Sequence, residues 1–186
     1  MKDKIETDFA RLLKLSVIEP VQTAEFGATP IVPVPKPNGP VRICGDFKVT
    51  INTYPDMQCY PLPNPEELRA GLADGKIFSK VDRGDAYLQL EVDPESQKYL
   101  VFSTHKGLFR YTRLLFRFHE APAIFQSTIE EILQKFAGII VYLDNLLITR
   151  RSMAEHNTRL RALFTRLRNA GIRLKRKKCE FGLTCL

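Results

Sequence analysis

The sequence predicts one α+β domain in which helices pack against antiparallel strands. Apolar residues recur at helical spacing in several segments, and short apolar runs bounded by turn residues lie between them. The two kinds of element are mixed along the chain, with no internal repeat or low-complexity segment. Because 44% of the 186 residues are apolar, the chain can form a real hydrophobic core.

In the first third of the chain, each expected element has a local cause. An N-terminal amphipathic helix is indicated by the apolar stripe Ile5, Phe9, Leu12 and Leu13. Residues 31–34 and 41–44 are short apolar runs typical of strands, and the Pro- and Gly-rich residues 35–40 between them favour a turn. A second helix is expected to begin at Asn64, which can act as its cap, because proline and two glutamates follow.

Strands are expected next near residues 77–81, 88–92, 100–103 and 109–114. Residues 122–136 predict a helix whose buried stripe is Ile124, Phe125, Ile129, Ile132, Leu133 and Phe136. Residues 139–149 predict a tight hairpin. The capping box Ser152-Met-Ala-Glu155 then begins a helix that ends at Gly171.

Two aspartates stand at strand ends. Asp144 lies at the turn of the 139–149 hairpin, and Asp82 ends the strand 77–82. If the strands are neighbours in one sheet, the two carboxylates could bind two Mg²⁺ ions for phosphoryl or nucleotidyl transfer. An ordinary Asp-Asn hairpin turn is the alternative, since both residues tolerate the left-handed conformation.

Composition narrows the class of protein. Four scattered cysteines without a C-x-x-C pair and three scattered histidines make a zinc site or a disulfide framework unexpected. No apolar run reaches the roughly 18 residues of a transmembrane helix, and the charged N-terminus lacks a signal peptide. We therefore expect an intracellular protein without a membrane partner. Cytoplasm or nucleus, and the oligomeric state, stay open.

The net charge of +7 is concentrated in one segment. Residues 150–178 hold eleven Lys or Arg and one acidic residue, so they carry +10. Such a segment suits a polyanionic partner. A solvated helix face followed by a basic tail explains it equally well.

Taken together, the motifs resemble those of a reverse transcriptase, and they are most similar to the enzymes of gypsy-type long-terminal-repeat retrotransposons and their retroviral relatives. The resemblance runs through nearly the whole chain in ordered blocks. These are Pro30-Ile-Val-Pro-Val-Pro-Lys36, Val41-Arg42-Ile-Cys-Gly-Asp46-Phe-Lys48, Tyr60-Pro-Leu-Pro63, Phe78-Ser-Lys-Val-Asp82, Ala86-Tyr87-Leu-Gln89, Ser96-Gln-Lys-Tyr99, Thr104-His-Lys-Gly-Leu-Phe-Arg-Tyr111, Ala121-Pro-Ala-Ile-Phe-Gln126, Tyr142-Leu-Asp-Asn145, Gly171-Ile-Arg-Leu-Lys175 and Lys178-Cys-Glu-Phe181.

The resemblance implies the fingers and palm of a right-hand polymerase, with an antiparallel palm sheet packed on helices. The fingers would be roughly residues 1–80 and 95–120, and the palm the remainder. In the family the thumb, connection and ribonuclease H regions follow; none is expected within these 186 residues, so the thumb is absent and the grip on an RNA/DNA template–primer would be poor.

The resemblance also implies residue roles. Asp82 and Asp144 would be the catalytic aspartates that hold two Mg²⁺ (or Mn²⁺) ions, with the carbonyl of Arg83, and Lys178 would protonate the leaving pyrophosphate. The residues implied to bind the dNTP are Lys36, Arg42, Arg83, Tyr87, Phe116 and Arg117. Among them, Lys36 and Arg42 match fingers residues that clamp the phosphates, and Tyr87 matches the aromatic steric gate. Solvated turn residues and core filling are the alternative roles for Lys36, Arg42 and Tyr87.

Several positions depart from the family pattern, and they cluster at the implied active site. Asn145 replaces the second aspartate of Tyr-x-Asp-Asp, and an amide cannot supply its charge to hard cations. Arg117 replaces a glycine that allows close backbone approach, and His119-Glu120 replace small residues. Arg83 stands where an apolar residue is usual. We therefore expect a weakened metal site, and a copy of the enzyme that is inactive or strongly impaired.

Three hypotheses about function follow. The chain is an RNA-directed DNA polymerase domain, a non-catalytic nucleic-acid-binding remnant, or an interaction module that reuses the fold. Shared fold does not decide among them.

Overall fold

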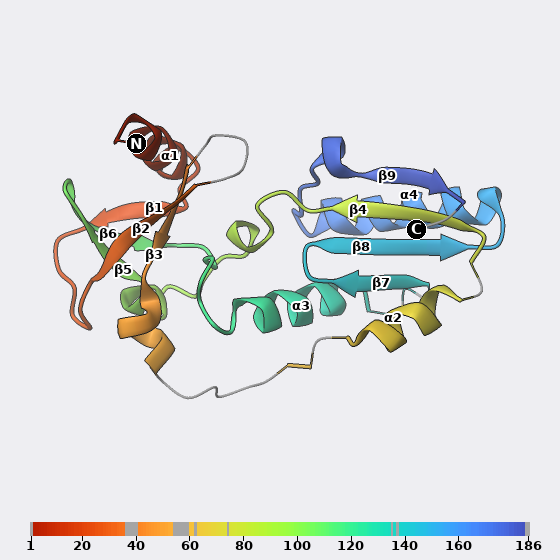
Figure 1. Cartoon of the computed structure of the whole chain (residues 1–186), viewed down its shortest axis with the longest axis horizontal. Coiled ribbons are helices and arrows are strands. Elements are labelled where there is room, and N and C mark those ends of the chain that lie inside the picture. Colours follow the sequence, from red (N-terminus) through yellow and green to blue (C-terminus); the bar gives the residue numbers. More distant parts are fainter. Residues whose placement is uncertain are drawn as a thin grey trace. The chain divides into compact units, whose positions relative to one another are not determined.

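The computed structural model describes residues 2–35, 41–53, 60–61, 63–73, 75–134, 136 and 138–184. The chain forms two compact units, shown in Figure 1. The first unit comprises Met1–Met57 and Tyr87–Ala121, and the second comprises Gln58–Ala86 and Pro122–Leu186. Each unit has its own sheet, and the mixture of sheets and helices confirms the predicted α+β class.

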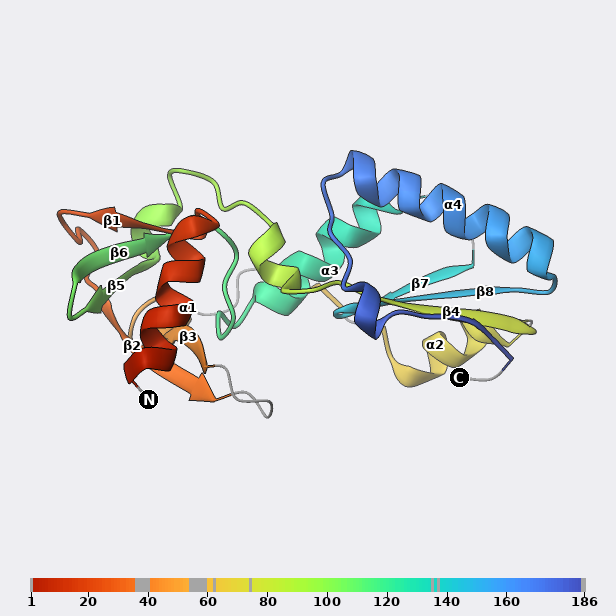
Figure 2. The same cartoon turned by 90° about the horizontal axis from the view of Figure 1, so that it is seen from above.

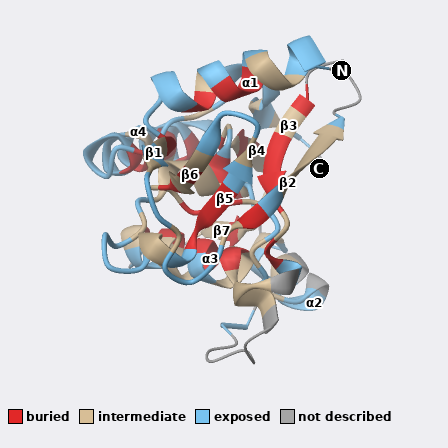
Figure 3. Cartoon of the chain, turned by 90° about the vertical axis from the view of Figure 1, so that its left-hand side faces the viewer, coloured by how far each residue is buried: buried red, intermediate tan, exposed pale blue. Residues whose placement is uncertain are grey.

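The first unit is a five-stranded sheet with order β1-β6-β5-β2-β3, in which only β2 and β5 are parallel. Its core is formed by apolar residues of the sheet and of helix α1, including Phe9, Leu12, Ile43, Phe102, Phe109 and Tyr111. Figure 3 shows buried segments, in red, on β3, on β5 and on one side of α1. The elements are α1 (Lys2–Lys14), β1 (Ile18–Val21), β2 (Thr29–Pro35), β3 (Val41–Gly45), β5 (Val101–Thr104), β6 (Gly107–Tyr111) and the 3₁₀ helices Phe47–Val49, Ile51–Thr53, Ala86–Gln89 and Gln97–Tyr99.

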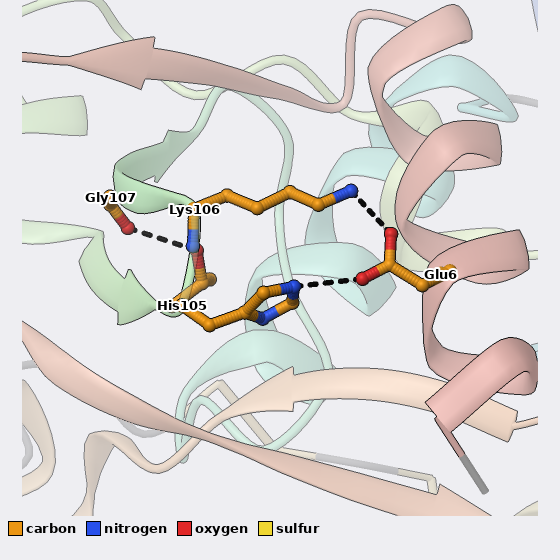
Figure 4. A network of polar contacts seen from close by, with 5 residues as sticks. Glu6, His105, Lys106 and Gly107 are labelled. Atoms are coloured by element: carbon orange, nitrogen blue, oxygen red, sulfur yellow. Dashed lines mark hydrogen bonds and ion pairs between the residues drawn. The ribbon is translucent and has the colours of Figure 1, made fainter.

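Two acidic residues of α1 attach this helix to the sheet. Asp8 is only 7% exposed, and its carboxylate accepts hydrogen bonds from the Ile43 amide (2.9 Å) and from Arg11 Nε (2.8 Å), as a buried charge requires. On the surface, Glu6 contacts Lys106 and His105 of the β5–β6 turn (Figure 4). The Lys106 hydrogen bond, with His105, lowers the pKa of Glu6.

The second unit is a four-stranded antiparallel sheet with order β7-β8-β4-β9. Helix α4 packs on β8 and β4 through Leu160, Leu163 and Leu167, and α2 packs beside β7. Figure 2 shows α4 running along the sheet. The elements are α2 (Pro65–Leu72), β4 (Ile77–Asp82), α3 (Ala121–Ile132), β7 (Ile139–Tyr142), β8 (Asn145–Arg150), α4 (Met153–Asn169), the 3₁₀ helix Arg176–Lys178 and β9 (Glu180–Leu183).

The predicted start of α2 and the predicted start and end of α4 are confirmed. Asn64 and Glu67 form a complete capping box at α2. The Ser152 hydroxyl accepts a hydrogen bond from the Glu155 amide at α4, and Gly171 follows that helix with φ +71°. No helix in the described part of the chain is long and apolar enough to cross a bilayer.

Other local expectations are wrong. The strand expected at 88–92 is instead the 3₁₀ helix Ala86–Gln89 followed by a single bridge between Glu91 and Arg113, because the left-handed Asp85 turns the chain just before it. Helix α3 ends at Ile132, and Ile124 on its stripe is 38% exposed. The edge strands β1 and β9 were not expected; both are four residues long.

A buried histidine, His156, joins α4 to the sheet, and we expect it to make the stability of the fold depend on pH. The Ser79 hydroxyl accepts a hydrogen bond from the Gly182 amide and is also hydrogen-bonded to Nε2 of His156 at 2.7 Å. Burial, and then the charge of Arg150, lowers the pKa of His156 from its ordinary 6.5. Below pH 6.5 the unfolded chain takes up a proton that the folded chain does not. The free energy of unfolding therefore decreases as the pH is lowered, by up to about 1.4 kcal/mol per pH unit.

We expect His156→Gln to remove this component. The measurement is urea unfolding of both proteins at pH 7.5 and near pH 5.5, and the readout is the difference between their pH slopes. The exposed His119 supplies the control, since His119→Gln is expected to keep the slope of the unmodified chain. Equal slopes for His156→Gln and the unmodified chain would contradict the assignment.

Candidate active site

The two predicted aspartates lie at the same end of neighbouring strands. Asp82 is the last residue of β4 and pairs with Asn145, the first residue of β8. Asp144 precedes Asn145, and its carbonyl accepts a hydrogen bond from the Arg83 amide at 3.1 Å. This pairing confirms the expected antiparallel arrangement of strands 77–82 and 145–150.

The hairpin turn is shifted by one residue from the expected one. Tyr142 of β7 pairs with Asn145 of β8, so the turn residues are Leu143 and Asp144, and Asn145 already belongs to the strand. Leu143 has a φ of +47°, the positive value that two-residue hairpins require at their first turn position. Pairing of Asn145 with Asp82 on its other side explains why it is extended.

Arg83 lies beneath this turn. Its side chain is 1% exposed. The guanidinium donates to the carbonyls of Leu143, Asp144 and Asn145 and lies 4.7 Å from the centre of the Phe125 ring. The sequence assigned Arg83 to substrate binding, and in the structure burial directs its guanidinium to the hairpin backbone.

Gln126 also supports the hairpin and received no role from the sequence. Its amide nitrogen donates to the Val141 carbonyl at 2.9 Å, and its amide oxygen accepts from the Leu143 amide at 3.2 Å. The side chain is fully buried. A glutamine beside Phe125 and Ile129 on an apolar stripe is the signal that could have identified it.

A basic segment lies beside the end of β4. The Lys175 amide donates to the Asp82 carbonyl at 2.9 Å, and Lys178 Nζ lies 3.7 Å from Asp82 Oδ2. Five exposed cations belong to this segment, which we call the basic segment: Arg173, Lys175, Arg176, Lys177 and Lys178. The structure thus places Lys178 next to the first aspartate.

The residues at this end of the sheet do not fit a pair of Mg²⁺ ions. Asp82 and Asp144 supply two negative charges, whereas Arg83 and Lys178 supply two positive ones, so the four side chains sum to zero. Asn145 adds no charge, and no cluster of three His, Cys, Asp or Glu suited to a metal occurs among the described residues. Hard cations need anionic oxygen ligands, so the donor set is too weak for two of them.

Three of the expected dNTP-binding residues form a stack in the first unit. The Arg42 guanidinium lies 3.8 Å from the centre of the Phe116 ring, and the Phe116 and Tyr87 rings are 5.1 Å apart. Arg42 is thus held against an aromatic face, which orients a cation that would otherwise be flexible. Lys36 lies outside the described residues.

Arg117 adopts a backbone conformation that favours glycine. Its φ is +72°, and a side chain costs roughly 1–2 kcal/mol in this region. Asn52 holds the segment, because its amide donates to the Arg117 carbonyl at 2.9 Å and its oxygen accepts from the His119 amide at 3.2 Å. The backbone shape expected of a glycine is therefore retained although the residue is arginine.

Comparison with known families gives a match over most of the chain. The family model described as reverse transcriptase (RNA-dependent DNA polymerase) matches residues 34–185. The chain is 37% identical over 181 residues to the uncharacterized protein K02A2.6 of Caenorhabditis elegans, covering 97% of this chain and 14% of that protein. It is 33% identical over 171 residues to the transposon Tf2-7 polyprotein of Schizosaccharomyces pombe, covering 91% and 13%. The chain thus spans about one seventh of these relatives.

Solved structures give the same result. The foamy viral protease-reverse transcriptase in complex with double-stranded DNA superimposes with a TM-score of 0.89 and 27% identity, covering 98% of this chain and 32% of that one. The same viral protein in complex with an RNA/DNA hybrid gives 0.85 and 26%, covering 97% and 24%.

Proposed function

Because this chain belongs to the reverse transcriptase (RNA-dependent DNA polymerase) family, we propose that it binds template–primer nucleic acid while its own nucleotidyl transfer is strongly impaired. One observation carries the proposal. The β4–β8 pairing brings Asp82 and Asp144 to the same end of the sheet together with Asn145 and Arg83. The strand arrangement is that expected of a metal-dependent polymerase site, but the side chains lack the net negative charge that such a site needs.

The proposed division assigns the first unit to the fingers and the second unit to the palm. It differs from the expected bounds, because residues 58–80 then belong to the palm and residues 87–94 to the fingers. We further propose a gypsy-type retrotransposon origin. The ordered motif blocks support it, as does the similarity to transposon polyproteins.

In the proposed palm, Asp82 and Asp144 stand where the metal-binding carboxylates of the family would be, but Arg83 and Lys178 offset their charges, so they form too weak a donor set for two Mg²⁺ or Mn²⁺ ions. Lys178, 3.7 Å from Asp82, is placed to donate a proton near that carboxylate. Loss of one preorganised electrostatic group commonly costs about 10²–10³ in rate. Asn145 alone would therefore impair catalysis severely.

In the proposed fingers, Arg42 would contact the dNTP phosphates and Tyr87 would lie under the sugar. Their contacts with Phe116 support this, because the stack holds both side chains in defined positions. Lys36 would be a second phosphate ligand. Arg117, which is exposed, would put a long side chain where the family has none.

Nucleic-acid binding is the part of the proposal that the basic segment supports. Its five cations are exposed and lie beside the end of β4. The foamy viral relatives of this fold were solved with double-stranded DNA and with an RNA/DNA hybrid. Binding through Lys and Arg releases counterions from the phosphates, so affinity should fall linearly with salt on logarithmic axes.

We expect the combined replacement of Arg173, Lys175, Arg176 and Lys177 by Gln to flatten that salt dependence. Each lost phosphate contact should reduce the slope by about 0.9 on duplex DNA. Fluorescence anisotropy with an RNA–DNA hybrid between 50 and 200 mM salt (roughly the range over which such contacts dominate) measures it.

A charge-matched control replaces the exposed Lys2, Lys4, Lys14 and Lys76 by Gln, and it should keep the slope closer to that of the unmodified chain. Equal slopes in the two variants would show that the basic segment is only a solvated surface. Primer extension tests the catalytic half of the proposal, and no extension is expected.

A further inference from the structure

The hairpin that carries Asp144 is held from below by a buried positive charge. Arg83 is 1% exposed, and its guanidinium is always protonated. It donates to three consecutive carbonyls, those of Leu143, Asp144 and Asn145, while its own amide donates to Asp144. The side chain and the amide of Arg83 thus both donate hydrogen bonds to the backbone of the turn.

The surroundings of Arg83 stabilise a cation. The Phe125 ring lies against the guanidinium, at 4.7 Å from its centre. The three carbonyls turn their negative ends towards it. The structure therefore holds a fixed charge behind the turn, at a position where an apolar residue is usual in the family that the motifs resemble.

Asn145 lies next to this charge. Its carbonyl is one of the three acceptors, at 3.4 Å from Arg83 Nη2. Its side-chain oxygen Oδ1 is buried and has no hydrogen-bond partner among the described residues. The guanidinium contacts Asn145 through the backbone carbonyl, and an aspartate at this position would add a carboxylate to the same residue.

We propose that Arg83 is an internal cation that holds the Leu143–Asn145 turn in place of a divalent metal ion. The proposal rests on the assignment of this end of the sheet as the former metal site. It has two consequences. The turn keeps its form without any metal, and a carboxylate introduced at position 145 is neutralised by Arg83 before it can contribute to a metal site.

A double-mutant cycle tests both consequences. The four proteins are the unmodified chain, Arg83→Met, Asn145→Asp and the combination of both. In EDTA we expect Asn145→Asp to change the thermal midpoint little. We expect the combination to lower the midpoint by clearly more than the two single changes together, because the carboxylates then repel one another without a cation.

Manganese binding, measured by electron paramagnetic resonance, is the second readout. We expect the combination to bind Mn²⁺ roughly 10–100-fold more tightly than Asn145→Asp alone, and Mn²⁺ to restore its thermal midpoint. The midpoint of the unmodified chain should not respond to Mn²⁺. Adding Asp144→Ala to the combination should abolish the tight binding.

A second substitution at position 83 keeps the test decisive if Arg83→Met does not fold. Arg83→Lys retains the charge but loses the guanidinium, so with Asn145→Asp it should still bind Mn²⁺ weakly. The proposal is overturned if Asn145→Asp alone binds Mn²⁺ as tightly as the combination, or if Mn²⁺ stabilises the unmodified chain. Neither readout involves nucleic acid, so failure here is distinguishable from failure of the proposed function.

Discussion

The purified chain is expected to show no template-directed primer extension above background, with either Mg²⁺ or Mn²⁺. Asn145 deprives the site of one negative charge, and Lys178 and Arg83 offset the charges of Asp82 and Asp144. Loss of one preorganised group commonly lowers the rate by about 10²–10³. A shortfall of several charges beside hard cations should place extension below detection.

The single change Asn145→Asp is not expected to restore activity. Groups that act as a unit are strongly non-additive, and Arg83 would neutralise the new carboxylate. The least change that we expect to give extension combines Asn145→Asp, Arg83→Met and Arg117→Gly with small residues at positions 119 and 120. The combination is best measured in a chimera, in which residues 1–186 replace the matching segment of an active relative.

Asp144→Ala in that chimera is the control, since it should abolish any extension that the combined changes produce. The opposite result is simple to recognise. If the unmodified chain incorporates dNTPs and Asp144→Ala removes this activity, the site is less damaged than its charges indicate.

Phe102→Ala is expected to give the largest loss of stability in the first unit, about 3–5 kcal/mol. Phe102 is 0% exposed and contacts Phe109 and Tyr111, with ring centres 6.1 and 4.8 Å away. Truncation removes the buried ring and leaves a cavity among residues that cannot fully collapse. Urea unfolding followed by tyrosine fluorescence measures the change.

Leu15→Ala is the matched control. Leu15 belongs to the same unit and is also large and apolar, but it is 45% exposed. Its truncation should change the free energy of unfolding by no more than about 0.5 kcal/mol. Similar losses for the two variants would mean that Phe102 does not lie at the centre of this core.

Elements with a strong local cause were predictable. The proline and acidic residues after Asn64 and the capping box at Ser152 identified helix starts that the structure confirms. The hairpin of β7 and β8 was predicted to within one residue of its turn. Strands β1 and β9 were missed because their sequences, Ile-Glu-Pro-Val and Glu-Phe-Gly-Leu, contain a glutamate and a proline or glycine and so give no apolar run.

The resemblance, read from the sequence alone, identified the family, and local patterns placed Asp82 and Asp144 at strand ends. Only the tertiary structure decided what surrounds them. Arg83 is buried beneath a turn some sixty residues later in the chain, and Gln126 reaches that turn from α3. Local spacing shows which side chains share a strand or helix, but not which distant backbone they meet. The charge balance of the site, and with it the expected loss of catalysis, therefore depends on contacts that form only when the chain folds.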